Sequence, residues 1–333
     1  MINEKIRSYA LTGWSAILRL LGQAGLVSIN TSKGRRYRTS MVHGNIRRTF
    51  NIYLPAQNNT AEIPLVIVLH GRGANGASME LLTRNGFNKL SDREGFLVVY
   101  PDGVGMTWND GRKDQKTKDR AHLENIDDVG FISALIDFMI NNYGASREKV
   151  FVTGLSNGAI MAYRLGCELP ERLSAIAPVD GNIPRTFCEE CRPGKPLSVM
   201  AINNTDDPLV PFEGGVIQSG LARLDLGKVI STAESIKFWV KRNNCSSVPV
   251  EEEVSPGDSP GRLRVTKESY HDGMEGTGVV LITIHGGGHT WPGGVQYMPE
   301  RIIGKTCRNY NATEEIWSFF RQHSVRLQEA VHE

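Results

Sequence analysis

Six short apolar runs recur along the chain, and they constrain its fold more than any other feature. An apolar run without polar alternation is typical of a strand that is buried on both faces in the middle of a parallel sheet. Helical patterns alternate with several of the runs, which predicts an α/β fold: a mostly parallel, doubly wound sheet with helices on both faces. The runs are 64–69, 96–100, 150–153, 175–179, 197–202 and 279–284, and the helical patterns are 79–91, 130–143, 159–169, 232–242 and 313–323.

One domain accounts for nearly all of the 333 residues, and we expect it to span residues 36–326. It should begin with a basic connector at 36–40 and two hairpin strands near 39–43 and 48–54. Polar stretches at 106–125 and 181–196 are expected to form long loops. Residues 1–35 are expected to hold an amphipathic helix and connector, because Trp14, Ile17, Leu18 and Leu21 share one helical face. We expect this helix to dock on the protein rather than to contact a membrane.

The charge balance argues against a nucleic-acid partner. The chain carries 38 Lys and Arg against 36 Asp and Glu, a net charge of +2, whereas proteins that bind nucleic acid usually present a strongly basic surface. Composition therefore favours neither a strongly acidic nor a strongly basic partner.

Five cysteines leave at least one thiol outside any intramolecular disulfide. Cys188 and Cys191 form a lone C-x-x-C without a second pair, so a closed zinc site, which needs four ligands, is disfavoured. A disulfide among Cys188, Cys191, Cys245 and Cys307 is expected if the protein is exported. Cys167 is expected to be a buried thiol.

The strongest chemical signal is Gly154-Leu155-Ser156-Asn157-Gly158, which follows a strand pattern and opens a helix pattern. A serine on a sharp strand-to-helix turn has an exposed hydroxyl, and a glycine on each side lets the turn form without side-chain clashes. The hydroxyl would also lie at the positive end of the helix. We therefore interpret Ser156 as a nucleophile, with a plain surface turn as the alternative.

A serine needs a base to take its proton, so one of the eight histidines should serve Ser156. In this arrangement the acid and then the base follow the serine along the chain. His289, in a glycine-rich loop just past the last strand, is favoured over His285 at the end of that strand, and His271 lies in an acidic turn. Five histidines are not candidates for the base. His43, His70 and His122 precede Ser156, and His323 and His332 lie in or after the last helix, where a solvent-exposed role is expected.

The acid should follow a strand between Ser156 and His289. Asp207 is favoured over its neighbour Asp206, because the proline after Asp207 fixes an extended backbone. Asp180, after an earlier strand, is the weaker candidate. The acid would hold the imidazole tautomer and stabilise the imidazolium without itself taking the proton.

Two backbone N–H groups are needed for the oxyanion of the tetrahedral intermediate. We expect one from Asn157, the residue after the nucleophile, and one from Arg72 in the loop after an early strand, with Gly71 as the next choice. His70 in the same loop is expected to be a structural hydrogen-bonding residue.

Two tryptophans and two aspartates near these motifs also need an interpretation. Trp108 and Trp291 are candidates for substrate binding by stacking, with core packing as the alternative. Asp127 and Asp128 are expected to cap a helix rather than to contact substrate.

Five segments together carry a resemblance to a known family. They are His70-Gly71-Arg72-Gly73, Asp127-Asp128-Val129-Gly130-Phe131, Gly154-Leu155-Ser156-Asn157-Gly158-Ala159, Asp207-Pro208-Leu209-Val210-Pro211-Phe212 and Gly287-Gly288-His289-Thr290-Trp291-Pro292-Gly293. From about residue 49 to 323 the chain resembles the polyhydroxybutyrate depolymerases and related feruloyl esterases of the α/β-hydrolase superfamily. Where many members have His-Gly-Thr-Ala-Asp-Pro, this chain has Asn203-Asn204-Thr205-Asp206-Asp207-Pro208, which keeps the acid and adds a neighbouring carboxylate.

The resemblance implies an α/β-hydrolase fold and a serine carboxylesterase with Ser156, Asp207 and His289 as its triad. It implies no cofactor and no metal, and small or oligomeric ester substrates: hydroxyalkanoate oligomers, feruloyl esters or acetyl esters. A serine peptidase on the same fold and a non-catalytic ligand-binding homologue are the alternatives. Members are usually exported, whereas the lack of a clear signal peptide favours the cytoplasm, so both locations stay open.

Overall fold

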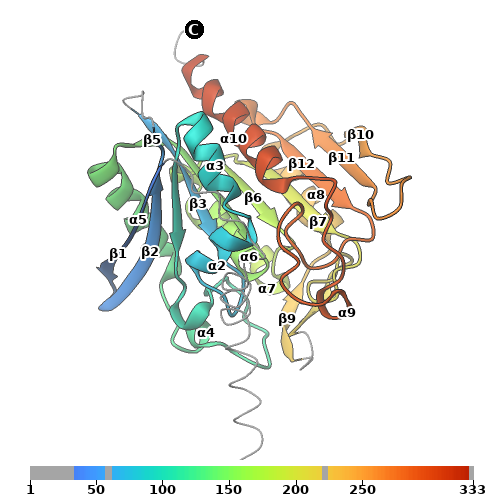
Figure 1. The fold of residues 1–333 in the computed structure, drawn as a ribbon, viewed down its shortest axis with the longest axis horizontal. Coiled ribbons are helices and arrows are strands. Elements are labelled where there is room, and N and C mark those ends of the chain that lie inside the picture. Colours follow the sequence, from blue (N-terminus) through green and yellow to red (C-terminus); the bar gives the residue numbers. More distant parts are fainter. Residues whose placement is uncertain (1–33, 57–61, 220–223, 330–333) are drawn as a thin grey trace, which may run out of the picture.

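The computed structural model describes residues 34–56, 62–219 and 224–329. A ten-stranded sheet forms its centre, in the order β1-β2-β4-β3-β5-β6-β7-β12-β11-β10 (Figure 1). The stretch from β4 to β12 is parallel, and antiparallel strands flank it at both edges. The strands are β1 Arg35–His43, β2 Ile46–Leu54, β3 Ile63–Leu69, β4 Leu97–Pro101, β5 Ala145–Leu155, β6 Ala175–Val179, β7 Ser198–Asn204, β10 Val250–Ser255, β11 Val265–Tyr270 and β12 Val279–Ile284.

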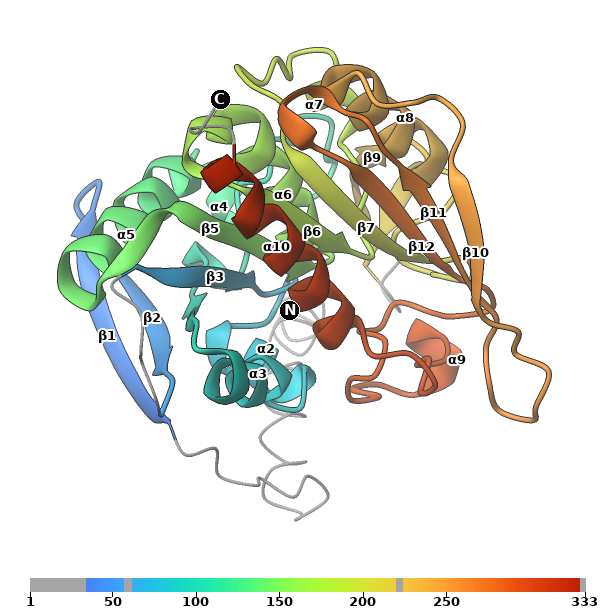
Figure 2. The same ribbon diagram turned by 90° about the horizontal axis from the view of Figure 1, so that it is seen from above.

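Helices cover both faces of this sheet (Figures 1 and 2). On one face, α5 Asp128–Tyr143, α6 Asn157–Glu168 and α8 Thr232–Asn243 share an apolar cluster with the strands. On the other, α2 Gly76–Leu82, α3 Gly86–Glu94 and α10 Ala312–Glu329 share a second cluster. The predicted doubly wound α/β sheet is therefore confirmed.

The apolar runs form central strands because both of their faces are buried. Leu65, Ile67 and Leu69 of β3 belong to the first cluster, whereas Val66 and Val68 belong to the second, and none of the five is exposed. Side chains alternate across a strand, so a run without polar residues supplies both clusters at once.

Two predictions about the first hundred residues need correction. The helix expected over 79–91 is two helices, α2 and α3, because Arg84 and Asn85 take left-handed backbone conformations with φ of 56° and 54°. The basic connector expected at 36–40 is part of β1, which pairs with β2 from Arg35 onwards. The predicted hairpin is present, and its turn consists of Gly44 and Asn45 between the two strands.

Several short elements were not predicted from the sequence. The edge strand β10 and its neighbour β11 were missed, because both lack an apolar run: β10 is Val-Glu-Glu-Glu-Val-Ser and largely exposed, and β11 is Val-Thr-Lys-Glu-Ser-Tyr. Charged residues are common on edge strands, where they oppose pairing with other chains. A separate hairpin, β8 Gly215–Gln218 with β9 Asp225–Val229, was missed too. The expected loops at 106–125 and 181–196 are present but carry one-turn helices, α4 Arg120–Leu123 and α7 Arg185–Cys188.

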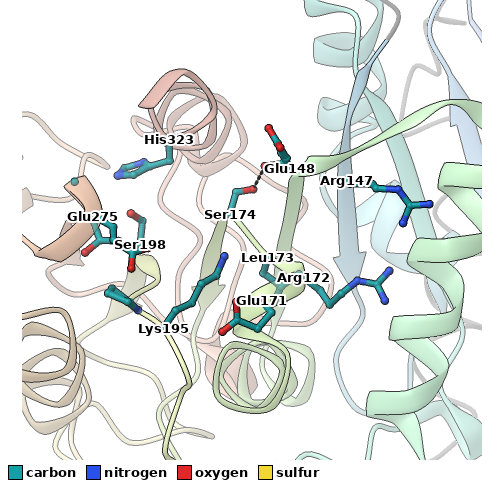
Figure 3. A pocket seen from close by; sticks show the side chains of 13 residues that line it. Arg147, Glu148, Glu171, Arg172, Leu173, Ser174, Lys195, Ser198, Glu275 and His323 are labelled. Carbon is teal, nitrogen blue, oxygen red and sulfur yellow. Dashed lines mark hydrogen bonds between the residues drawn. The ribbon is translucent and has the colours of Figure 1, made fainter. Parts of the chain in front are cut away.

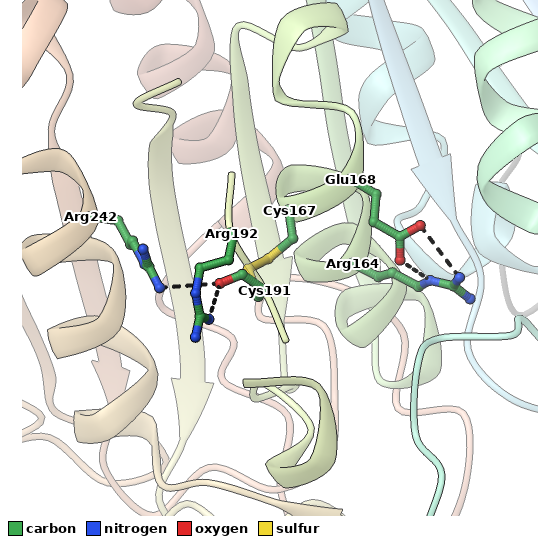
Figure 4. Close-up of a disulfide and its surroundings, with 6 residues drawn as sticks. All are labelled: Arg164, Cys167, Glu168, Cys191, Arg192 and Arg242. Carbon is green, nitrogen blue, oxygen red and sulfur yellow. Dashed lines mark hydrogen bonds and ion pairs between the residues drawn. A yellow bond between two sulfur atoms is a disulfide. The ribbon is translucent and has the colours of Figure 1, made fainter. Parts of the chain in front are cut away.

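A disulfide joins Cys167 of α6 to Cys191, just after α7 (Figure 4). The expectation that Cys167 is a free buried thiol was therefore wrong. Its partner comes from the loop at 181–196, which folds back over α6, and no spacing rule in the sequence reveals that contact. Cys188, Cys245 and Cys307 are free thiols.

The amphipathic helix expected within residues 1–35 lies almost wholly outside the described residues, which begin at 34. Among the helices that the structure does describe, none has the length and apolar character needed to cross a bilayer.

Candidate active site

Ser156 lies on a sharp turn between β5 and α6, with φ of 60° and ψ of −121°. Such a conformation is strained for a residue other than glycine. The turn packs too tightly for side chains on either side: a Cβ atom at Gly154 would lie 2.7 Å from the Gly158 carbonyl carbon, and one at Gly158 would lie 2.5 Å from the Leu69 oxygen. The Ser156 N–H donates to the Val179 oxygen at the end of β6, and its side chain is partly exposed. This is the backbone geometry expected of a serine on a nucleophile turn.

Asp207 and His289 form a buried pair. The His289 Nδ1 atom lies 2.6 Å from Asp207 Oδ2, and both side chains are 2% exposed. The second carboxylate oxygen of Asp207 accepts the N–H groups of Leu209 and Val210, so the carboxylate cannot rotate freely. With Nδ1–H donating to Asp207, the imidazole presents Nε2 as its proton acceptor.

The sheet brings the three predicted triad residues to one edge. Ser156 follows β5, Asp207 follows β7 and His289 follows β12, and these strands are parallel, with only β6 between β5 and β7. The carboxyl ends of parallel strands meet at the same edge, which is where open α/β sheets bind ligands.

The electrostatic surroundings favour the protonated form of His289. Burial by itself lowers the pKa of the imidazole, but the charge and hydrogen bond of Asp207, together with the charge of Asp180, outweigh it and raise the pKa above 6.5. A stronger base accepts a proton from a hydroxyl more readily, provided that the pH keeps it neutral.

The alternative candidates lie in different surroundings. Asp206 is exposed and accepts a hydrogen bond from the adjacent Thr205 hydroxyl. The ring nitrogens of His285 lie within hydrogen-bonding distance of Thr266 and Arg264, and burial and the Arg264 charge lower its pKa. Neither the Asp206 nor the His285 side chain forms a hydrogen bond with the side chains of Asp207 and His289 in the described part of the chain.

Both N–H groups expected to bind the oxyanion lack an acceptor among the described residues: neither Asn157 nor Arg72 donates its backbone N–H within the protein. The loop of Arg72 lies against the nucleophile turn, since a Cβ atom on Gly71 would be 3.4 Å from Ser156 Cβ. Unpaired N–H groups beside a nucleophile are what an oxyanion hole requires.

His70 has the predicted structural role. Its Nδ1–H donates to the Gly71 oxygen at 2.8 Å, and Nε2 accepts the Gly103 N–H at 2.9 Å. This pair of bonds uses one proton and one lone pair, as a neutral imidazole provides. Burial lowers the pKa of His70 to about 4, which keeps it neutral.

The loop between β4 and α5 contacts the side chains of both candidate oxyanion residues, through aspartates that sequence reasoning missed. Asp119 binds the Arg72 guanidinium at two points, 2.7 and 2.8 Å away. Asp110 accepts the Asn157 amide at 2.5 Å and is itself paired with Arg112 and His122. Burial alone would raise the pKa of Asp110, but those two partners lower it well below its ordinary value. The loop contains many polar residues, and nothing in their order marks these two aspartates.

The two tryptophans are not placed for stacking on a substrate. Trp108 and Trp291 are both 0% exposed. The Trp108 indole donates to the His70 oxygen, and that of Trp291 donates to the Thr313 hydroxyl. Their predicted substrate-binding role is therefore replaced by the alternative, core packing, because neither ring offers a face to solvent in this structure.

Asp127 caps α5, as predicted, by accepting the Gly130 N–H. Asp128 instead is fully buried, pairs with Arg48 at 2.6 Å and accepts the Asn109 N–H. Burial raises the pKa of Asp128, against the opposing effect of Arg48. Both roles are structural.

A separate cavity of about 190 Å³ is lined by residues that Figure 3 shows from close by. Its lining includes Ser174 and Ser198, which precede or begin β6 and β7, together with Lys195, Glu275 and His323. Because the triad candidates follow the carboxyl ends of the strands, this cavity is separate from the candidate site.

One group of side chains has the composition of a metal site. Asp180, Asp207 and His289 place ligand-type atoms within 4.8 Å of one another, the one such trio among the described residues. However, Asp207 and His289 already bond each other, and N–H groups occupy both Asp180 oxygens. The arrangement therefore suits proton transfer better than metal coordination.

Comparisons with known proteins show which proteins this chain is similar to. The protein NocK of Nocardia uniformis subsp. tsuyamanensis is 31% identical over 261 residues, which cover 77% of this chain and 73% of NocK. Feruloyl esterase B of Piromyces equi is 26% identical over 235 residues, 68% of this chain but 39% of that longer protein. The acetyl xylan esterase from Aspergillus awamori shares the fold with a TM-score of 0.52 at 18% identity, over 76% of this chain and 94% of its own.

A second solved structure with this fold is an S-formylglutathione hydrolase from Agrobacterium tumefaciens, with a TM-score of 0.50 at 13% identity over 90% of this chain and 98% of its own. The likeness confirms the predicted α/β-hydrolase fold. A family model described as "Esterase PHB depolymerase" matches residues 48–217, half of the chain, and includes Ser156 and Asp207. The chain therefore belongs to the esterase PHB depolymerase family.

Proposed function

We propose that this protein is a serine carboxylesterase with Ser156 as nucleophile, His289 as base and Asp207 as acid. The observation that carries the proposal is the buried 2.6 Å contact between His289 and Asp207, at the sheet edge where the strained Ser156 turn lies. Family membership adds weight, because the matched region holds two of the three residues.

In the first half of the reaction, Ser156 Oγ attacks the ester carbonyl carbon while His289 Nε2 takes its proton. The N–H groups of Asn157 and Arg72 bind the resulting oxyanion, and Asp207 stabilises the imidazolium. The intermediate then breaks the bond to the alcohol, which leaves with the proton from His289. An acyl group remains on Ser156.

In the second half, His289 takes a proton from water, and the hydroxide attacks the acyl carbon. The bond to Ser156 Oγ breaks, the serine recovers its proton from His289, and the carboxylic acid departs. No cofactor or metal is needed for either step.

We propose as substrates the esters that the resemblance implied: hydroxyalkanoate oligomers, feruloyl esters or acetyl esters. The names of two relatives refer to feruloyl and acetylxylan esters. Initial rates on methyl ferulate, acetylated xylan and hydroxybutyrate oligomers would rank the three classes. A chain that hydrolyses none of them, yet turns over a simple activated ester, would contradict this choice.

Hydrolysis of p-nitrophenyl acetate and butyrate tests the mechanism. We expect Ser156→Ala to lower kcat by about 10⁴-fold or more, and Asp207→Asn by about 10³–10⁴-fold because the imidazole tautomer is no longer fixed. Equal rates for wild type and Ser156→Ala would refute the proposal.

The chain offers matched controls for both partners of the serine. Asp206→Asn changes the adjacent, exposed carboxylate, and His285→Asn changes a histidine on the same loop as His289. Both should keep kcat/KM within about threefold of wild type, whereas His289→Asn should lose activity like Ser156→Ala.

A further inference from the structure

Asp180 is a fully buried carboxylate beside the triad that the mechanism above does not use. It follows β6, the strand between those that carry Ser156 and Asp207. Its backbone is left-handed, with φ of 49°, a conformation that few residues other than glycine adopt. Its N–H donates to the Ile202 oxygen of β7. A strained backbone that is retained at a buried site points to a demand on the side chain.

The Asp180 carboxylate connects the two loops that carry the acid and the base. Its Oδ1 accepts the backbone N–H of Asn204 at 3.0 Å and the Asn204 side-chain amide at 2.8 Å. Its Oδ2 accepts the same amide at 2.9 Å and the Thr290 N–H at 2.9 Å. Asn204 ends β7, three residues before Asp207, and Thr290 follows His289 directly.

The orientation of Asn204 indicates that its amide is needed as a donor. Its Nδ2 faces Asp180, which leaves its buried Oδ1 without a hydrogen-bond partner among the described residues, against Gly287 of the His289 loop. A buried carbonyl without a partner is costly. Turning the amide would place that oxygen against the Asp180 carboxylate, where two acceptors would meet.

The next residue connects the same turn to the nucleophile. A Cβ atom on Gly181 would lie 2.6 Å from the Ala159 Cβ and 3.2 Å from the backbone carbonyl oxygen of Ser156. The Ser156 N–H also donates to Val179. The turn 179–181 therefore contacts the segments of all three triad candidates.

Charge adds a second effect to this geometry. Asp180, Asp207 and His289 lie within 4.8 Å of one another, and every hydrogen bond that the described residues make to the Asp180 oxygens comes from an N–H group. Such donors favour the ionised carboxylate, although burial and the nearby Asp207 charge raise its pKa. Tyr297 also contacts this residue: its hydroxyl donates to the His289 backbone oxygen, and burial raises the pKa of Tyr297 well above 10.

We propose that Asp180 is a positioning residue of the active site, which fixes the Asp207 and His289 loops through Asn204 and Thr290 and places a second negative charge beside the imidazolium. The proposal rests on the proposed function. Asp180 and Asn204 would then act as a unit: substitution of either residue alone should lower the activity, and exchange of the two residues should restore part of it.

The test begins with Asp180→Asn and the pH dependence of kcat/KM on p-nitrophenyl acetate. The new amide would face N–H donors, so we expect a fall of about 10- to 100-fold. Loss of the negative charge also lowers the pKa of His289, so the acid limb of the profile should move to lower pH by about half a unit or more. A purely structural role would lower the rate without moving the limb.

Exchange of the partners supplies a second variant. Asn204→Asp alone sets two carboxylates together and should be at least as harmful as Asp180→Asn. The double variant Asp180→Asn/Asn204→Asp restores the contact between the two side chains with its direction reversed, but the amide NH2 at position 180 still meets one of the two backbone N–H groups. We therefore expect a partial recovery, with kcat/KM about tenfold above that of the worse single variant. Thermal unfolding of each variant shows which of them are folded.

The outcomes separate this proposal from the proposed function. If Ser156→Ala is inactive while Asp180→Asn keeps the wild-type rate and acid limb, the positioning role alone is overturned. It is also overturned if the double variant is folded but no more active than the worse single variant. If Ser156→Ala is fully active, the proposed function itself fails.

Discussion

His70 makes the stability of this protein sensitive to acid in a way that one substitution can reveal. The ring is fully buried, lies 4.9 Å from the Trp108 ring, centre to centre, and bonds one backbone group in each of two loops, the Gly71 oxygen after β3 and the Gly103 N–H after β4. Burial lowers its pKa from 6.5 to about 4. The unfolded chain therefore binds a proton at a pH where the folded protein does not.

The size of the effect follows from that difference in pKa. Because each tenfold change in proton affinity is worth about 1.36 kcal/mol, a pKa near 4 instead of 6.5 corresponds to about 3.4 kcal/mol. For a base with a lowered pKa, this stability is fully present above pH 6.5 and is lost as the pH falls through about 4. About 2.5 kcal/mol of it should be gone by about pH 4.5.

His70→Gln separates this contribution from all others that titrate. Its amide oxygen can accept the Gly103 N–H but the bond to Gly71 is lost, so at about pH 7.5 we expect the variant to be about 1–3 kcal/mol less stable than wild type. By about pH 4.5 that gap should close or reverse, because the variant has no imidazole to protonate.

Equilibrium unfolding in urea at several pH values, with the disulfide intact, measures the gap. Other groups titrate in both proteins and cancel in the difference. His271→Gln, at an exposed ring, is the matched replacement. A gap that stays constant between the two pH values, or that closes no more than for His271→Gln, would refute the reasoning.

Three further substitutions test single contacts. Cys191→Ser opens the disulfide with a separation of 24 residues and should cost about 3 kcal/mol in urea unfolding relative to Cys188→Ser, and an equal midpoint for the two would contradict this. Asp119→Asn weakens the two-point contact between the Asp119 carboxylate and the Arg72 guanidinium, which we call the Asp119–Arg72 clamp. We expect kcat/KM for p-nitrophenyl acetate to fall about tenfold at an unchanged thermal midpoint, and an unchanged rate would argue against a role for this contact. Asp127→Ala removes the cap of α5 and should cost about 1 kcal/mol in urea unfolding with kcat/KM unaltered, whereas no loss of stability would show the cap to be dispensable.

The sheet could be predicted because burial on two faces leaves a direct trace in sequence. A run such as 65–69 has no polar position, and only the middle of a layered sheet can bury all of it. The edge strands leave no such trace: β10 carries three glutamates and is largely exposed. The break at Arg84 and Asn85 was missed for a related reason, since two polar residues in a helical pattern are ordinarily an exposed helix face.

The candidate nucleophile, acid and base could be selected from the turn motif, from chain order and from the residues that flank each candidate, because parallel strands deliver their following loops to one edge. Their supports could not. The disulfide, the Asp119–Arg72 clamp and the Asp110–Asn157 bond each join segments that are dozens of residues apart but are not joined by a strand ladder. Such contacts depend on how loops pack, and a sequence read one segment at a time carries no measure of that packing.

Asp180 is an example, within the candidate active site, of a role that the sequence alone could not indicate. Its position after a strand made Asp180 the weaker candidate for the acid in the sequence analysis. In the structure, His289 bonds Asp207 and not Asp180, which favours Asp207. The sequence pattern could not show that two carboxylates lie beside the same imidazole and make different contacts. Asp207 faces the ring, whereas Asp180 faces the backbone after it and the asparagine that ends β7. The distinction depends on which atoms each oxygen meets, so the folded geometry, and not the pattern, is what supports our proposal that one residue serves proton transfer and the other alignment.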